Sequence, residues 1–177
     1  MDRGAVCALS GEDEGLFLLP GTHSKWAEVN GGRIISFRTF MTGEVFGALK
    51  EHTILGRLMR AGDFDADAFA RGVKEGAGLG GAGALLNRIF ATRSHGLLDR
   101  LPDTALSDYL SGLLIGAEIA EATGQTKSTV TIIADAALAQ RYTDALKLLN
   151  HDSALAPEDC VAAGHRKIAR AARLIKD

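Results

Sequence analysis

The chain has 177 residues, of which 46% are hydrophobic and 24% are charged, values typical of one globular domain. Twenty Lys and Arg against 22 Asp and Glu give a formal net charge of -2, so we expect neither a nucleic-acid partner nor binding to anionic membranes. The two cysteines, Cys7 and Cys160, show no metal-ligand spacing with His, and no apolar run reaches the ~20 residues that span a bilayer. These features predict a cytoplasmic protein that holds no metal through its own side chains.

Short strand-like runs open the chain. Leu16–Leu19, Trp26–Val29 and Ile34–Phe40 are rich in apolar, aromatic and β-branched residues, which predicts strands. Pro20-Gly21 ends the first run, and Asn30-Gly31-Gly32 between the next two is a strong hairpin signal. The sequence therefore predicts a three-stranded antiparallel meander.

The remainder of the chain alternates helical and extended patterns. Apolar residues at helical spacing predict helices from Thr42 through Leu49, then over Asp65–Lys74, Ala82–Phe90 and Thr104–Ala122. A strand at Thr129–Ile133, a helix over Ala136–Asn150, an extended piece at Ala154-Leu155 and a last helix from about Glu158 follow. This order predicts one α/β domain over residues 1–177, with a mixed sheet flanked by helices.

The turn after the first strand carries the chemistry that phosphate requires. In the segment LPGTHSKW, Gly21 lets the backbone approach a ligand, Thr22, His23 and Ser24 offer donors, and Lys25 supplies positive charge. A plain hairpin with a polar tip fits the same residues. Both interpretations stay open on spacing alone.

Two glycine patterns are more simply structural. Gly78–Gly83 contains the Gly-x-Gly-x-x-Gly string of dinucleotide loops, but a helical pattern precedes it instead of a strand, so we expect a connection between helices. Gly112 and Gly116 lie four residues apart inside a predicted helix. This spacing indicates that another backbone packs closely against that helix.

Further polar residues are candidates for binding an anionic substrate. Thr42 and Glu44 lie at a helix start, and Arg93 lies near a helix end. A favourable first-turn acid and a cation near a helix C-terminus explain Glu44 and Arg93 equally well. His23 beside Ser24 lacks an evident orienting acid, so we do not infer a hydrolase triad.

The segments LPGTHSKW, FRTFMTGEVFGAL with HTILG, and DYLSGLLIGAEI occur in this order and together resemble the 2-keto-3-deoxygalactonokinase family over essentially the whole chain. That family belongs to the actin, hexokinase and Hsp70 class. The resemblance implies a ribonuclease H-like, actin-like lobe, the carboxyl-terminal one of two. It also implies that ATP and Mg²⁺ bind between the lobes, and that the kinase phosphorylates the terminal hydroxyl of a sugar acid, 2-dehydro-3-deoxy-D-galactonate.

The resemblance also assigns residues. Gly21–Lys25 would form the second phosphate loop, and Ala134, Asp135 and Leu138 would lie in the adenosine motif. The family motif commonly begins with Gly and a small polar residue, whereas this chain has Ala134 and the charged Asp135. The extra carboxylate would either accept a hydrogen bond from a ribose hydroxyl or repel phosphate.

The family's amino-terminal lobe, with its first phosphate loop and the catalytic base, has no counterpart in the sequence by this resemblance. We therefore expect an incomplete active site, since phosphoryl transfer needs the nucleophile, the metal and the phosphates together. A non-catalytic nucleotide-binding or interaction module and a kinase for another sugar or sugar acid are the alternatives. An exposed lobe interface would favour a homo-oligomer.

Overall fold

The opening strands form one edge of a five-stranded sheet. The computed structural model describes residues 14–124, 128–157 and 160–175, and the order of strands in its sheet is β3-β2-β1-β4-β5. The strands are β1 (Gly15–Leu19), β2 (Ser24–Asn30), β3 (Arg33–Phe40), β4 (Val130–Ile132) and β5 (Ser153–Leu155).

The predicted meander is confirmed. β1 pairs with β2 and β2 with β3, both antiparallel, and the chain reverses between β2 and β3 through a two-residue loop. Gly31 and Gly32 in that loop have φ angles of 56° and 66°, a left-handed conformation that glycine adopts without steric penalty and that matches the twist of a hairpin.

The second half of the sheet is parallel. β1 pairs with β4, and β4 pairs with β5, both in parallel. The carboxyl ends of β1 and β4 therefore lie at the same edge of the sheet, and the segments that follow these two strands start side by side. In sheets of this kind ligands commonly bind at that edge.

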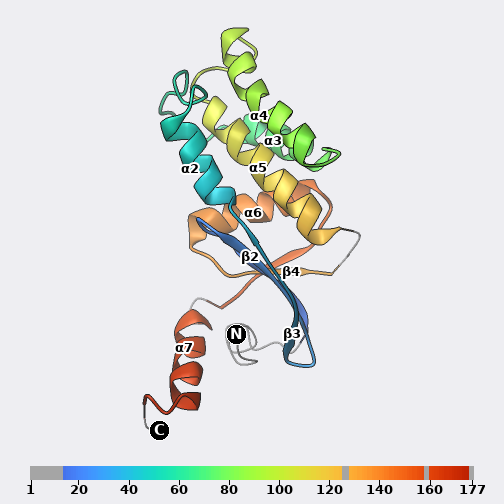
Figure 1. The fold of residues 1–177 in the computed structure, drawn as a ribbon, viewed down its shortest axis with the longest axis vertical. Helices are drawn as coiled ribbons and strands as arrows, with labels where there is room; N and C mark the ends of the chain where they lie inside the picture. Colours follow the sequence, from blue (N-terminus) through green and yellow to red (C-terminus); the bar gives the residue numbers. More distant parts are fainter. Residues whose placement is uncertain (1–13, 125–127, 158–159, 176–177) are drawn as a thin grey trace.

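The helices follow the predicted order, and the predicted mixed α/β class is confirmed. They are α2 (Thr42–His52), α3 (Ala66–Ala77), α4 (Ala82–Leu97), α5 (Leu106–Thr123), α6 (Ala136–Leu148) and α7 (Cys160–Ala171). In Figure 1, α2 to α5 gather on one side of the strands, α6 lies between them and the sheet, and α7 lies at the other end. The predicted start of the last helix, Glu158, lies outside the described residues, as does Cys7.

Apolar side chains alternate between the two faces of the sheet. Leu16, Leu18 and Trp26 pack in one cluster with residues of α3, α5 and α6. Phe17 and Ala27 belong to a second cluster that contains Cys160 of α7. Helices α3, α5 and α6 thus cover one face of the sheet, whereas on the other face Cys160, the first residue of α7, packs with strand and loop residues.

α3 and α5 cross at very short distance, as the glycine spacing predicts. A Cβ atom added at Gly112 or Gly116 of α5 would lie 2.1 or 2.2 Å from a backbone oxygen of α3. On α3, the same addition at Gly72 or Gly76 would bring Cβ within 2.2 or 2.1 Å of a backbone oxygen of α5. Glycines on both helices therefore allow the backbones to touch.

The Gly-x-Gly-x-x-Gly string connects helix α3 to helix α4 and follows no strand, so it lacks the setting of a dinucleotide loop. Among the residues described, no helix has both the length and the apolar character needed to cross a membrane.

Candidate active site

The β1–β2 loop presents its residues unevenly. Thr22 and His23 are exposed, Gly21 and Lys25 are half-buried, and Ser24 is fully buried. The Lys25 ammonium donates a hydrogen bond of 2.8 Å to the His23 carbonyl, which leaves two of its three N–H groups for other acceptors. A Cβ atom added at Gly21 would meet nothing within 4 Å, so the protein leaves open space above this backbone.

The amino-terminal turn of α2 packs directly on this loop. The Glu44 backbone N–H donates to the Thr22 carbonyl at 2.9 Å, and a Cβ added at Gly43 would lie 2.5 Å from the Gly21 carbonyl oxygen. His23 Nε2 and Glu44 Oε2 are 2.5 Å apart, and both side chains are about half exposed. Two candidates that the sequence offered separately, the loop and Glu44, thus belong to one site.

The predicted adenosine motif lies at the same edge of the sheet. The Ile133 N–H donates to the Leu18 carbonyl at 2.9 Å, which holds the β4–α6 turn beside the end of β1. Asp135 is the N-cap of α6, and its carboxylate accepts a hydrogen bond from the Leu138 N–H at 3.0 Å. This capping role explains the acid that departs from the family pattern, and Ala134 beside it is exposed.

A buried carboxylate lies beneath the loop. Glu118 of α5 is 3% exposed, Trp26 Nε1 donates to its Oε1, and the Tyr142 hydroxyl donates to its Oε2, each at 2.8 Å. The Tyr142 hydroxyl is also 3.0 Å from Ser24 Oγ. The hydroxyl of Ser24, which was predicted to donate to phosphate, therefore forms its hydrogen bond inside the protein.

Burial dominates the ionisation of this cluster. Desolvation raises the pKa of the Glu118 carboxyl above its ordinary value, and hydrogen bonds from Thr42, Trp26, Tyr142 and Ser24 partly oppose that rise by favouring the ionised form. Burial, followed by the neighbouring Glu118 charge, raises the pKa of the Tyr142 hydroxyl. Tyr142 therefore stays protonated and remains a donor.

The remaining candidates for substrate binding, Thr42 and Arg93, lie in different parts of the protein. Thr42 lines a cavity of about 710 Å³ together with Glu118 and the glycine-rich connection between α3 and α4. Arg93 Nη1 donates to the Ile54 carbonyl at 3.0 Å, beyond the carboxyl end of α2. Glu44 lies in the first turn of α2, and about 12 Å of helix lies between it and the carboxyl end of α2, beyond which Arg93 binds.

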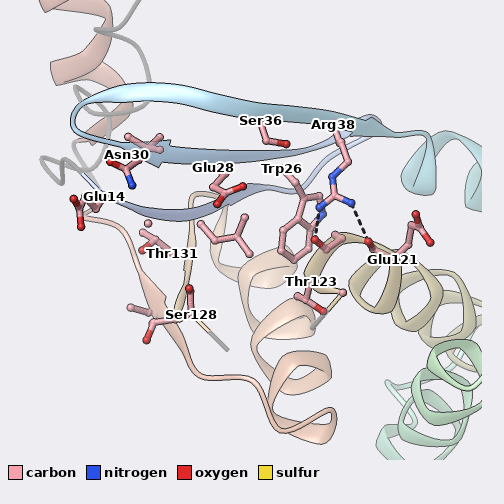
Figure 2. Close-up of a pocket in the computed structure, with 17 residues that line it drawn as sticks. Glu14, Trp26, Glu28, Asn30, Ser36, Arg38, Glu121, Thr123, Ser128 and Thr131 are labelled. Carbon is pink, nitrogen blue, oxygen red and sulfur yellow. Dashed lines mark hydrogen bonds between the residues drawn. The ribbon is translucent and has the colours of Figure 1, made fainter. Parts of the chain in front are cut away.

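Another cavity, of about 750 Å³, lies near the start of β1, away from the loop. Figure 2 shows Arg38 reaching from β3 across this cavity to the end of α5, where it donates to the carbonyls of Glu121 and Ala122. None of the predicted site residues lines it. These hydrogen bonds of Arg38 connect β3 to the end of α5.

The part of the chain that the structure describes contains no group of three or more His, Cys, Asp or Glu side chains arranged to hold a metal ion.

Comparison with known proteins identifies the family. A profile of the family described as 2-keto-3-deoxy-galactonokinase matches residues 3–168. The chain belongs to this family. It is 36% identical over 159 residues to the 2-dehydro-3-deoxygalactonokinase of Escherichia coli K12, an alignment that covers 88% of this chain and 53% of the relative.

Other family members agree. A Rhizobium meliloti protein named probable 2-dehydro-3-deoxygalactonokinase DgoK1 is 33% identical over 181 residues, which cover 95% of this chain and 56% of the relative. The crystal structure of a Sinorhizobium meliloti protein assigned as a 2-dehydro-3-deoxygalactonokinase superposes with a TM-score of 0.84 at 32% identity. That superposition covers 99% of this chain and 58% of the other. The chain thus spans just over half the length of these relatives.

The sequence predicted the loop and the start of α2 as candidates, the resemblance added the β4–α6 turn, and Glu118 was not among the candidates. One signal was present, because an acid inside the apolar run Leu113–Ile119 is unusual unless it is paired.

Proposed function

We propose that this chain provides the nucleotide-binding face of an ATP-dependent kinase for 2-dehydro-3-deoxy-D-galactonate. The observation that supports the proposal most directly is the meeting of three segments at one edge of the sheet: the β1–β2 loop, the start of α2 and the β4–α6 turn. The family membership of the chain supports the substrate.

The loop would bind the ATP phosphates. The open space above Gly21 admits an oxygen close to the backbone, Thr22 offers an exposed hydroxyl, and Lys25 offers a charge-assisted donor. Ser24 would contribute by fixing the end of the loop through Tyr142. Because His23 and Glu44 bond to each other, their pairing sets the loop's distance from α2.

The β4–α6 turn would bind the adenosine. Asp135 already caps α6, so the amino terminus of this helix is occupied by a carboxylate and disfavours a phosphate. The exposed small residue Ala134 leaves room for the ribose and base. Leu138, half-buried in the first turn of α6, offers an apolar contact.

Magnesium fits this arrangement as an ion carried mainly by the nucleotide. When bound, it neutralises charge that develops on the phosphates during transfer. Glu44 is an acidic side chain beside the loop, and one of its oxygens already contacts His23. Thr42 and Glu44 are our candidates for contacts to the sugar acid, and Arg93 remains a candidate at the other end of α2.

Nucleotide binding tests the proposal directly. Backbone amide shifts of the purified chain would be followed by NMR during titration with ATP and Mg²⁺. We expect shifts in residues 20–25 and 134–138 together, adenosine to shift only the second set, and inorganic triphosphate to shift only the first. Absence of any shift in residues 20–25 with either phosphate ligand would contradict the proposal and leave a plain hairpin.

Turnover tests the expectation of an incomplete site. In a coupled ADP-release assay with 2-dehydro-3-deoxygalactonate, we expect the 177-residue chain to show no turnover in the ordinary enzyme range of roughly 1 to 1000 per second. Turnover in that range would show that this chain contains its own base. Binding without turnover is also what the alternative function, a non-catalytic nucleotide-binding module, would give. Only turnover after addition of a separately produced family amino-terminal region separates the kinase from that module.

Two further expectations remain proposals. A kinase that uses metabolic ATP would act in the cytoplasm. Self-association is supported by exposed apolar side chains on α4, where Leu86, Phe90 and Leu97 are 73%, 55% and 58% exposed. Light scattering across a concentration series would test it, and a mass of one chain at every concentration would exclude it.

A further inference from the structure

Glu118 is a charged residue in an unusual environment. It lies in the middle of α5, a helix whose described residues are mostly buried, and both of its carboxylate oxygens are engaged. Trp26 Nε1 donates to one oxygen and the Tyr142 hydroxyl donates to the other. The Thr42 side chain lies near this carboxylate, and both residues line the same cavity.

The partners come from the three segments that form the candidate site. Trp26 and Ser24 lie on β2 directly after the β1–β2 loop, and Ser24 joins the cluster through the Tyr142 hydroxyl at 3.0 Å. Thr42 is the first residue of α2 and precedes Gly43, which touches the loop. Tyr142 lies on α6, the helix that Asp135 caps.

We propose that Glu118 is a positioning residue of the nucleotide site, which fixes the phosphate loop, the start of α2 and the adenosine helix α6 relative to one another through its two carboxylate oxygens. This inference rests on the proposed function for the identity of the ligand. Its geometric content, the coupling of three segments through one side chain, is independent of that function.

A carboxylate suits this task better than an apolar side chain. Burying a charge is unfavourable, and apolar residues of similar volume often stabilise a protein more. Without an acceptor, however, the Trp26 N–H and the Tyr142 O–H would be buried donors with no partner at this position. Fixed acceptors also restrict the direction of each donor, so the side chain specifies orientation as well as proximity.

The test uses a matched pair of tyrosines in the same chain. Tyr142→Phe removes a buried hydroxyl that donates to Glu118. Tyr109→Phe removes a buried hydroxyl that donates to Glu75 at 2.7 Å, and Tyr109 lies nine residues before Glu118 on α5, about 13 Å along the helix. Both variants should lose thermal stability, and Tyr142→Phe should lose more, because it removes hydrogen bonds to both Glu118 and Ser24, whereas Tyr109→Phe removes the bond to Glu75.

Only Tyr142→Phe should change the site. Without nucleotide, we expect its amide shifts to move at Gly21, Thr22 and Gly43, together with the indole N–H signal of Trp26, the single tryptophan of the chain. With ATP and Mg²⁺, we expect the Kd to rise by roughly two- to tenfold, a change of the size that one hydrogen bond is worth, because the loop is no longer held in its binding geometry. Tyr109→Phe should leave the shifts and the Kd unchanged.

Glu118 itself is tested by two substitutions. Glu118→Gln keeps an acceptor for Trp26, and it should retain part of the affinity that Glu118→Ala loses. If Glu118→Ala does not fold, the Tyr142→Phe and Tyr109→Phe comparison still decides.

The outcomes separate this inference from the proposed function. Loop and α2 shifts in nucleotide-free Tyr142→Phe, with no ATP binding by the wild type, would support the coupling and contradict the nucleotide role. Binding of ATP by the wild type, with Tyr142→Phe and Tyr109→Phe indistinguishable in loop shifts and Kd, would overturn the positioning role and leave Glu118 as a residue that acts only on stability.

Discussion

The contact between α2 and the β1–β2 loop can be tested by adding one methyl group to α2. In Gly43→Ala the new Cβ would lie 2.5 Å from the Gly21 carbonyl oxygen and 2.8 Å from the Thr22 Cα. Favourable carbon contacts need about 3.5–4.0 Å, so the loop must move by roughly 1 Å. Both neighbouring atoms belong to the backbone, and a rotamer change therefore cannot relieve the contact.

The expected magnitude follows from two opposing effects. Overpacking of a well-packed contact costs about 1–3 kcal/mol, and replacing glycine by alanine in a helix returns about 0.5–1 kcal/mol. We expect Gly43→Ala to lose about 1–2 kcal/mol of unfolding free energy. It should also weaken ATP binding, because the displaced loop no longer presents its donors in one geometry.

Gly47 provides the control in the same helix. A Cβ added there would meet nothing within 4 Å, so Gly47→Ala should gain about 0.5–1 kcal/mol through helix propensity. Urea unfolding and ATP titration of the wild type and both variants measure the difference. Equal stability of Gly43→Ala and Gly47→Ala, with unchanged loop amide shifts, would refute the packing argument.

Other substitutions test the helix contact, the buried acids and the loop charge. Gly112→Ala, whose Cβ would lie 2.1 Å from a backbone oxygen of α3, should lose more than about 3 kcal/mol of unfolding free energy in urea, whereas wild-type stability would disprove the close crossing. Because the pKa of Glu118 in the folded protein is raised from 4.5, protonated Glu118 contributes favourably to the unfolding free energy below that value, and this contribution is lost as pH rises through the folded pKa. The unfolding free energy of Glu118→Gln relative to the wild type should therefore increase with pH. A difference between the two proteins that stays constant from pH 4 to 8 would contradict this. Burial, the largest single influence on the Glu75 carboxyl, raises its pKa, but hydrogen bonds from Tyr109 and Arg71 and the charges of Arg71 and Arg88 together outweigh burial and lower the pKa in the folded protein. The wild type should therefore be more stable than Glu75→Gln at neutral pH, and this difference in unfolding free energy should decrease on acidification. A difference that increases at acidic pH would contradict the prediction. Lys25→Ala should weaken ATP binding by about 1 kcal/mol, and by less at high salt because ions screen the Lys25 charge. An unchanged Kd at low salt would show that Lys25 makes no charge-assisted contact with ATP.

Much of the architecture could be predicted because its signals are local. Asn30-Gly31-Gly32 specifies a hairpin by its own backbone preferences, and the four-residue spacing of Gly112 and Gly116 specifies one helix face whatever packs on it. The loop at Gly21–Lys25 was predicted for a similar reason, because its residue types and its position after a strand are contiguous in the chain.

The arrangement of the site was harder to predict, because it depends on pairs that are distant in sequence. Trp26 and Glu118 are 92 positions apart, and Ser24 and Tyr142 are 118 apart. No spacing rule relates such residues, and their contacts follow only after the sheet order is known. Gly43 also carried a weak signal, since the atoms that leave no room for a side chain there belong to Gly21 and Thr22, 22 and 21 residues earlier in the chain.

Asp135 has a simple local role in addition to the one that the resemblance implies. The resemblance suggests that its carboxylate accepts a hydrogen bond from a ribose hydroxyl or repels phosphate. An Asp immediately before a helix is also an ordinary N-cap, and its carboxylate accepts a hydrogen bond from the Leu138 N–H. The Asp135 carboxylate occupies the amino terminus of α6, a position that would otherwise favour an anion. In the proposed site, phosphate would therefore bind at the β1–β2 loop, where Lys25 supplies positive charge, and the uncharged adenosine would bind at the α6 end. The parallel pairing of β1 with β4 brings these two ends to the same side of the sheet, where one nucleotide would reach both. The hydrogen bonds of Glu118 to Trp26 and Tyr142 would, under the proposed positioning role, set the distance between them.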